Sequence, residues 1–189
     1  MSHPNVQINT AGAPLSPSNP LPVSTTIAAG FGAIASASFS RPADVTAYAS
    51  GDLVANSTTA GSVVAVALAN AVREAGGVSR VERVRLRKSG TGLTNASFRV
   101  HLFAAAPVPV NGDNGALSTP IANYIGAVDV ALDRAFTDGA TGAGVPLVGG
   151  SMTFTIPIGT TLFALIEARG AYTPVSGETF TVIAELYRF

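Results

Sequence analysis

The chain has 189 residues, of which 47% are hydrophobic and 12% charged, and its eleven basic and eleven acidic side chains cancel at neutral pH. This length fits one ordinary domain, and the balanced charge argues against direct binding to nucleic acid or to an acidic membrane surface. The absence of cysteine excludes a disulfide framework, a thiolate zinc site and a cysteine nucleophile. No apolar run approaches the roughly 20 residues of a membrane helix. Because few charges cover the surface, we expect a homo-oligomer that buries part of it.

Residues 1–24 are predicted to form an extended arm, because prolines interrupt the segment at Pro4, Pro14, Pro17, Pro20 and Pro22. Proline breaks a helix interior and cannot donate to a strand ladder, so neither a helix nor a central strand is expected there. Two interpretations stay open: a disordered tail, or an arm that becomes ordered against a neighbouring subunit. Residues 25–189 are predicted to form a single β-sandwich domain.

The first strand signals after the arm begin at Ile27, and the segment from Ala65 to Ala75 is interpreted as a strand rather than a helix. The clearest signal is a predicted hairpin of residues 81–88 and 96–104, joined by a turn-rich segment. In its first strand Val84 and Leu86 alternate with arginines, and the second strand alternates in the same way. We therefore expect one half-buried hairpin whose outer face carries Arg83, Arg85, Arg87, Arg99 and His101.

Later strands are predicted over residues 121–131, 152–156, 161–169 and 178–186. The third and fourth of these are apolar on both faces, which is typical of a central strand or of a subunit contact. Eight to ten short strands separated by turn signals indicate an all-β fold. The expected architecture is an antiparallel β-sandwich, most simply a jelly roll.

The sequence contains no recognisable nucleophile motif or metal-ligand spacing. The two histidines are His3 in the arm and His101 on a strand, and no G-x-S-x-G occurs. The NGDNG segment at 111–115 is interpreted as a tight turn rather than a calcium loop. Residues 133–144 are glycine-rich without a P-loop pattern, and we interpret them as a long flexible loop. We therefore predict no catalytic residue, no metal site and no cofactor.

A pair of carboxylates could still act in a glycosidase. The candidates are dispersed, and the chain has no tryptophan and four tyrosines to bind a sugar. This weakens the enzyme interpretation and the sugar-binding one. The carboxylates considered are Asp129, Asp133, Glu167, Glu178 and Glu185.

Charge is unevenly distributed along the chain. Residues 73–99 hold seven basic and two acidic side chains, whereas residues 111–189 hold three basic and seven acidic ones. One interpretation is a solvated strand face whose charges discourage edge-to-edge aggregation. A second is that the arginine stripe docks on an acidic surface of a neighbouring subunit through guanidinium–carboxylate pairs. A third is nucleic-acid binding, against which the basic strand lacks interleaved aromatic side chains to stack on bases.

Five segments of the chain carry a resemblance to a known class of protein. Residues 41–57, 81–103, 111–118, 132–140 and 167–186 together resemble small, cysteine-free structural proteins of tailed bacteriophages, the capsid decoration or cement proteins. The resemblance implies a β-rich virion protein that binds the major capsid protein on the outer surface of the assembled head in many copies. It also implies stabilisation of the shell, and it favours a trimer among the arrangements that such proteins adopt. The arm prolines and the arginine stripe are then the candidate contacts.

A different class stays open beside this one. A β-sandwich on a phage tail or baseplate, or a secreted accessory protein, could bind a carbohydrate or a receptor, because the fold alone does not separate these roles. Exposed tyrosines gathered in one groove would favour this alternative. The tyrosines considered are Tyr124, Tyr172 and Tyr187.

Overall fold

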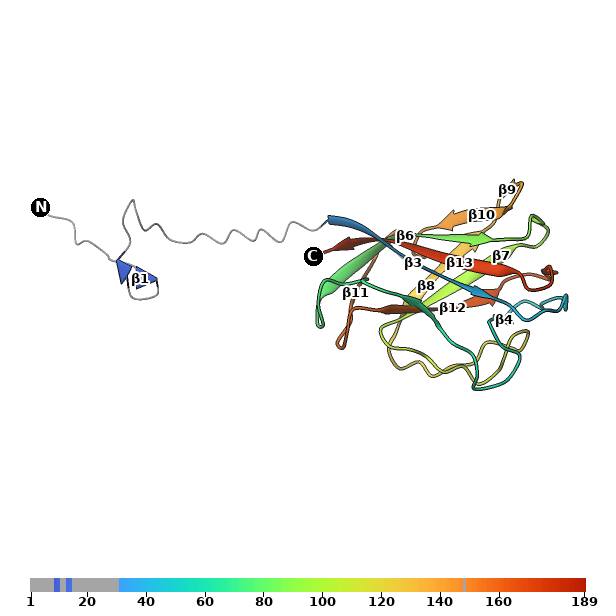
Figure 1. The fold of residues 1–189 in the computed structure, drawn as a ribbon, viewed down its shortest axis with the longest axis horizontal. Helices are drawn as coiled ribbons and strands as arrows, with labels where there is room; N and C mark the ends of the chain where they lie inside the picture. Colours follow the sequence, from blue (N-terminus) through green and yellow to red (C-terminus); the bar gives the residue numbers. More distant parts are fainter. Residues whose placement is uncertain (1–8, 11–12, 15–30, 148) are drawn as a thin grey trace, which may run out of the picture.

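The computed structural model describes residues 9–10, 13–14, 31–147 and 149–189, and in these residues it is an all-β protein without a helix. Every strand pair is antiparallel, and the strands from residue 31 onward form two sheets packed face to face (Figure 1). The predicted antiparallel β-sandwich is confirmed.

The larger sheet has six strands in the order β3-β13-β6-β10-β9, and a further short strand, β11, also pairs with β6. These strands are β3 (Phe31–Ser40), β6 (Val78–Lys88), β9 (Arg134–Phe136), β10 (Gly139–Gly144), β11 (Met152–Thr155) and β13 (Thr179–Arg188).

The smaller sheet has five strands in the order β4-β12-β7-β8, with β5 also paired to β12. These strands are β4 (Leu53–Val54), β5 (Val66–Leu68), β7 (Ser97–Phe103), β8 (Tyr124–Ala131) and β12 (Leu162–Ala168).

Within the predicted arm, two short strands pair only with each other, β1 (Asn9–Thr10) and β2 (Ala13–Pro14). Pro14 thus lies in a two-residue ladder. The other arm prolines lie outside the described residues, and so does the arm's predicted contact with a neighbour. They are Pro4, Pro17, Pro20 and Pro22.

The core lies between the two sheets, where strands such as β6 and β7 bury alternate side chains. Val84 and Leu86 of β6 and Phe98 of β7 are fully buried in one apolar cluster. Phe98 packs edge-on against Phe180 of β13, with ring centroids 5.4 Å apart, so an aromatic contact ties the two layers together. Burial of this apolar surface is the main stabilising contribution to the fold.

The two strands predicted to be apolar on both faces are central, as expected. β13 lies between β3 and β6, and β12 lies between β7 and the short strands β4 and β5. On its outer side β12 contributes Leu165 to a second buried cluster, together with Leu53, Val63 and Phe103. This second cluster therefore covers part of the outer face of the five-stranded sheet.

The predicted hairpin of residues 81–88 and 96–104 is wrong. β6 pairs with β13 and β7 pairs with β12, so the connection between them crosses from one sheet to the other. The alternating pattern correctly identified the buried face of each strand. It could not identify the partner, because two strands that face each other across a core have the same pattern as two strands side by side.

The long flexible loop predicted at residues 133–144 is also wrong. This segment forms β9 and β10, which pair with each other while β10 pairs with β6. Its glycines permit a close backbone approach to β8. A Cβ at Gly142 would lie 2.0 Å from the carbonyl oxygen of Ala131, and one at Gly144 would lie 1.9 Å from that of Asp129. Glycine inside a strand often marks such an approach.

The strand predicted over residues 65–75 is present only as β5, and turns and bends follow it. The jelly roll stays a prediction. The strand order favours it, because the first and last long strands, β3 and β13, are neighbours, and successive strands alternate between sheets over much of the chain.

Candidate functional site: the outer face of the six-stranded sheet

The outer face of the six-stranded sheet carries the arginines of β6. Val84 and Leu86 point into the core, so Arg83, Arg85 and Arg87 project to the opposite side. Neither of the two buried apolar clusters of the described residues lies on this side. The face is therefore an open sheet surface on which the arginine stripe stands.

Two of these arginines share a carboxylate on the neighbouring strand. Arg83 donates from Nε to Oε2 and from Nη2 to Oε1 of Glu185, each at 2.9 Å. Arg85 Nε lies 2.7 Å from Glu185 Oε1, without hydrogen-bond geometry. A shift in strand register follows Glu185, and a bulge of this kind re-aims side chains. Glu185 thus holds both guanidinium groups in place on the sheet.

Arg87 differs from its two neighbours. It is exposed, and no ion pair or hydrogen bond holds its side chain within the described part of the chain. It borders a depression of about 330 Å³ whose wall includes Arg85, Phe136, Asp138 and Thr141. Phe136 is 58% exposed. Arg87 therefore has an open bidentate donor set next to an apolar ring, which suits a partner's carboxylate.

Apolar side chains extend this face toward β3. A shallow groove of about 820 Å³ is lined by Ile34, Arg80, Glu82 and Tyr187, among others. Ile34 is 66% exposed. The Arg80 guanidinium lies 5.5 Å from the centroid of the Tyr187 ring, a cation–π distance. The face thus combines exposed apolar surface with positive charge.

The stripe predicted from the sequence is divided between two faces. Arg99 and His101 lie on β7, so they project from the outer face of the five-stranded sheet, on the far side of the core from Arg83, Arg85 and Arg87. The prediction of one common face is wrong because it depended on the hairpin pairing. No single flat partner can contact all five residues.

On the five-stranded sheet Arg99 and His101 already have partners. Arg99 forms a bidentate pair with Asp129, at 2.6 and 2.8 Å, and this pair lowers the pKa of Asp129. His101 Nε2 lies 2.8 Å from Glu167 Oε2. Burial lowers the pKa of His101 against the opposing effect of Glu167. Arg99 and His101 are therefore paired with carboxylates of their own sheet.

The three tyrosines do not share a groove. Tyr124 is 40% exposed on β8, Tyr187 lies on the outer face of β13, and Tyr172 is 2% exposed. The gathering that would have favoured a carbohydrate-binding module is therefore not found.

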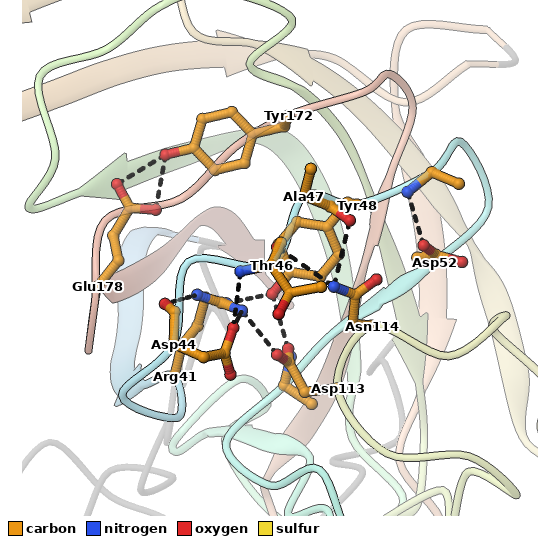
Figure 2. A network of polar contacts seen from close by, with 12 residues as sticks. Arg41, Asp44, Thr46, Ala47, Tyr48, Asp52, Asp113, Asn114, Tyr172 and Glu178 are labelled. Atoms are coloured by element: carbon orange, nitrogen blue, oxygen red, sulfur yellow. Dashed lines mark hydrogen bonds and ion pairs between the residues drawn. The ribbon is translucent and has the colours of Figure 1, made fainter.

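The sequence did not predict a buried polar network at one end of the sandwich (Figure 2). Asp113 of the NGDNG segment accepts hydrogen bonds from Arg41 Nη2 at 2.8 Å, Tyr48 Oη at 2.7 Å and the Ala55 amide at 2.7 Å. Arg41 Nε also donates to Tyr48 Oη. The Asp113 carboxylate is thus occupied by donors of its own chain, which supports the interpretation of this segment as a turn rather than a calcium loop.

A second buried ion pair lies next to the first. Lys88 Nζ donates to Glu178 Oε1 at 3.2 Å and to the Gly90 carbonyl at 2.8 Å. Tyr172 Oη lies 2.7 and 2.6 Å from the two Glu178 oxygens, and burial raises the pKa of Tyr172 well above its ordinary value. One sequence signal existed: the alternation of β6 places Lys88 on the same face as Val84 and Leu86, so a lysine on a buried face requires a carboxylate partner.

Most of the dispersed carboxylates already have a cationic partner. Four of the five dispersed carboxylates are held by cations: Asp129, Glu167, Glu178 and Glu185. Among the described residues no group of three His, Asp or Glu side chains could hold a metal ion. None of the described segments forms a helix long and apolar enough to cross a membrane.

No family model matches the sequence, and no curated protein matches it either.

Proposed function

We propose that this protein is a structural protein of a tailed-phage virion, which binds the major capsid protein on the outer surface of the assembled head in many copies and stabilises the shell. The observation that carries the proposal is the open outer face of the six-stranded sheet. There Arg87 has no ion pair within the described part of the chain, and exposed Ile34 and half-buried Tyr187 extend the same face. The resemblance to decoration proteins supports the same conclusion.

The proposed mechanism is multivalent clamping. A protein that contacts two or more capsid subunits at once gains effective concentration from each successive contact. Because it binds only the assembled shell, it stabilises that shell by mass action. Each single contact can then be weak, as expected for an exposed arginine that meets a carboxylate, and no catalytic step is required.

The partner surface is expected to be acidic. Arg80, Arg83, Arg85 and Arg87 of β6 lie near three carboxylates, so the arginines still outnumber the acidic groups. These carboxylates are Glu82, Asp138 and Glu185. Charge complementarity of this kind sets register and association rate more than total affinity. Binding should therefore weaken as salt rises, because salt screens exposed pairs.

The test is the copy number of the chain in virions purified from the phage that encodes it, measured by quantitative mass spectrometry against the major capsid protein. A ratio within a small factor of the capsid protein is expected. A handful of copies per particle, or none, would overturn the proposal and move the protein to a tail or to a function outside the particle.

A second candidate function is a binding module for a carbohydrate or a receptor. One observation favours it: an open groove of about 400 Å³ beside His101, Phe103, Thr119, Ile121 and Tyr124 on the five-stranded sheet. The Thr119 hydroxyl is buried there without a hydrogen-bond partner in the described residues. Glycan-array binding that is lost in Tyr124→Ala and kept in Tyr187→Ala would support this second function.

A further inference from the structure

The outer edge of β3 is unpaired. Among the described strands β3 pairs with β13 alone, so one row of its amide and carbonyl groups has no strand partner. The pairing with β13 runs from Phe31 to Ser40 without a register shift. β3 is therefore a long, regular strand at the border of the sheet (Figure 1).

The other edges of the sandwich are blunted in ways that prevent further pairing. β9 has three residues and includes Arg134, β11 has four residues, and β4 and β5 have two and three residues. β8 has an irregularity in its ladder, and Pro146 forms a bridge with Val128 on that strand. Short strands, charges, bulges and covering segments are the usual protections of an edge.

β3 lacks a charge, a proline and a register shift, and the only element of the other sheet described close to it is the short strand β5, near Phe39. Its ten residues, FGAIASASFS, include no charged residue and no proline. A monomeric protein rarely leaves such an edge open, because it is a template for pairing with another chain. The contrast with the other edges indicates that a partner strand covers β3.

The surroundings of the edge are apolar. Ala33, Ala37 and Phe39 pack against the core from β3 but are only partly buried. Ile34 on the outer side is 66% exposed, and Val64, which borders a narrow cleft with Phe39, is 69% exposed. A strand added here would bury apolar surface on both sides of the sheet as well as form backbone hydrogen bonds.

We propose that β3 of one copy pairs antiparallel with β3 of a second copy about a two-fold axis, which joins the two six-stranded sheets into one continuous sheet. A second copy suits the edge because the strand is uncharged, so self-pairing brings no like charges together. A two-fold contact also lets one surface patch serve both subunits. This inference goes beyond the proposed function, since it concerns the free protein and not the capsid.

The alternation of β3 limits the register. Ile34, Ser36 and Ser38 are exposed on the outer side, whereas Ala35 is buried. Directly opposed residues of an antiparallel pair project from the same face. The registers with the greatest overlap therefore centre on Ser36 opposite Ser36, or on Ala35 opposite Ala35. In the first the two Ser36 side chains face each other, and in the second they are diagonal neighbours.

This geometry permits a charge-swap experiment on the full chain. Ser36 is exposed and its side chain makes no hydrogen bond in the described residues, so Ser36→Lys and Ser36→Asp should both fold. Each variant alone places like charges across the axis. A mixture of the two places opposite charges there.

The measurement is the mass in solution by sedimentation velocity and light scattering, at protein concentrations from 1 to about 100 µM, with far-UV circular dichroism as the check of folding. We expect a wild-type mass of about twice 19.0 kDa, a monomer for each single variant, and recovery of the dimer when the two variants are mixed. Thr155→Lys, at an exposed position of β11 away from β3, is the matched control and should stay dimeric.

Several results would overturn the inference. They are a wild-type monomer over the whole range, a trimer such as the resemblance implies, folded Ser36 variants with unchanged mass, or a mixture that stays monomeric. Copy number in virions is measured independently, so failure of this contact and failure of the capsid proposal can be distinguished.

Discussion

Tyr48 and Tyr172 stack with their ring planes 9° apart and their centroids 6.4 Å apart, and each of them hydrogen-bonds to the carboxylate of a different buried ion pair. The stack joins Arg41–Asp113 to Lys88–Glu178, whose four side chains are all fully buried. Residues distant in the sequence are held together in this way at one end of the sandwich (Figure 2).

Removal of Asp113 should strongly destabilise the fold. Asp113→Ala leaves the Arg41 guanidinium buried without its main anionic partner, and breaking a buried pair from one side costs about 3–5 kcal/mol. Urea unfolding measures the loss. The control is Glu82→Gln, which breaks an exposed pair with Arg80 and should cost less than about 1 kcal/mol. Equal effects of the two variants would contradict the importance of the buried network.

Gly142→Ala should also destabilise the protein, because the new methyl group meets the Ala131 carbonyl oxygen and the backbone must shift. Overpacking of this kind typically costs about 1–3 kcal/mol. The matched control is Gly92→Ala, since nothing lies within 4 Å of a Cβ at that position. Thermal unfolding of the two variants side by side is the measurement, and a Gly142→Ala variant as stable as its control would contradict the close approach of β8 and β10.

Stability should fall as the pH falls below about 6.5, in part through His101. Burial lowers the pKa of His101 below its ordinary value of 6.5, aided by Arg99 and opposed by Glu167 and Asp129. The unfolded chain therefore binds a proton at a higher pH than the folded chain does. The stabilising contribution is complete above pH 6.5 and is lost as the pH decreases toward the folded pKa.

His101→Gln provides the test of this pH dependence. Its free energy of unfolding should vary less between pH 7.5 and pH 5.5 than that of the wild type, in urea titrations at each pH. Parallel curves for the two proteins would assign the dependence to other groups.

Arg87 should contribute to shell binding through its charge. Arg87→Gln is expected to weaken binding to purified shells roughly two- to fivefold, the effect of one exposed ion pair. The control is Arg169→Gln. Arg169 directly follows β12 in the other sheet and pairs with Glu167, so this variant should bind as the wild type does. Co-sedimentation at two salt concentrations measures both variants. A larger effect at Arg169 would place the contact on the five-stranded sheet.

Hydrophobic alternation predicted most of the strands but not how they pair. The alternation of Phe98, Val100 and Leu102 predicted β7, and the apolar run around Leu162 predicted β12. Both predictions were possible because the burial of a strand face depends on the local order of apolar residues. The sequence placed Arg99 and Arg83 on one face because β6 and β7 were expected to pair. The true partners, β13 and β12, are distant in the sequence, and local alternation does not identify them. Glycine-rich β10 was missed for a related reason: its strand character comes from the neighbours β6 and β8 and not from its own side chains.

The buried network was beyond sequence reasoning for the same physical reason. Arg41 and Asp113 are 72 positions apart, and Lys88 and Glu178 are 90 apart. Nothing in the local pattern of Arg41 or Asp113 indicates that they meet. Only Lys88 could be suspected from the sequence, because it lies on the buried side of β6 and needs a carboxylate partner there.

The close approach of β8 and β10 restricts local opening of the sandwich on that side. Backbone contact at Gly142 and Gly144 and the bridge from Val128 to Pro146 fasten the two sheets along one side. The β3 side has no backbone bridge between the sheets among the described residues. In a single copy without a partner strand, thermal opening should therefore start at β3, and its amide protons should exchange with solvent by local opening while those of β8 and β10 require global unfolding.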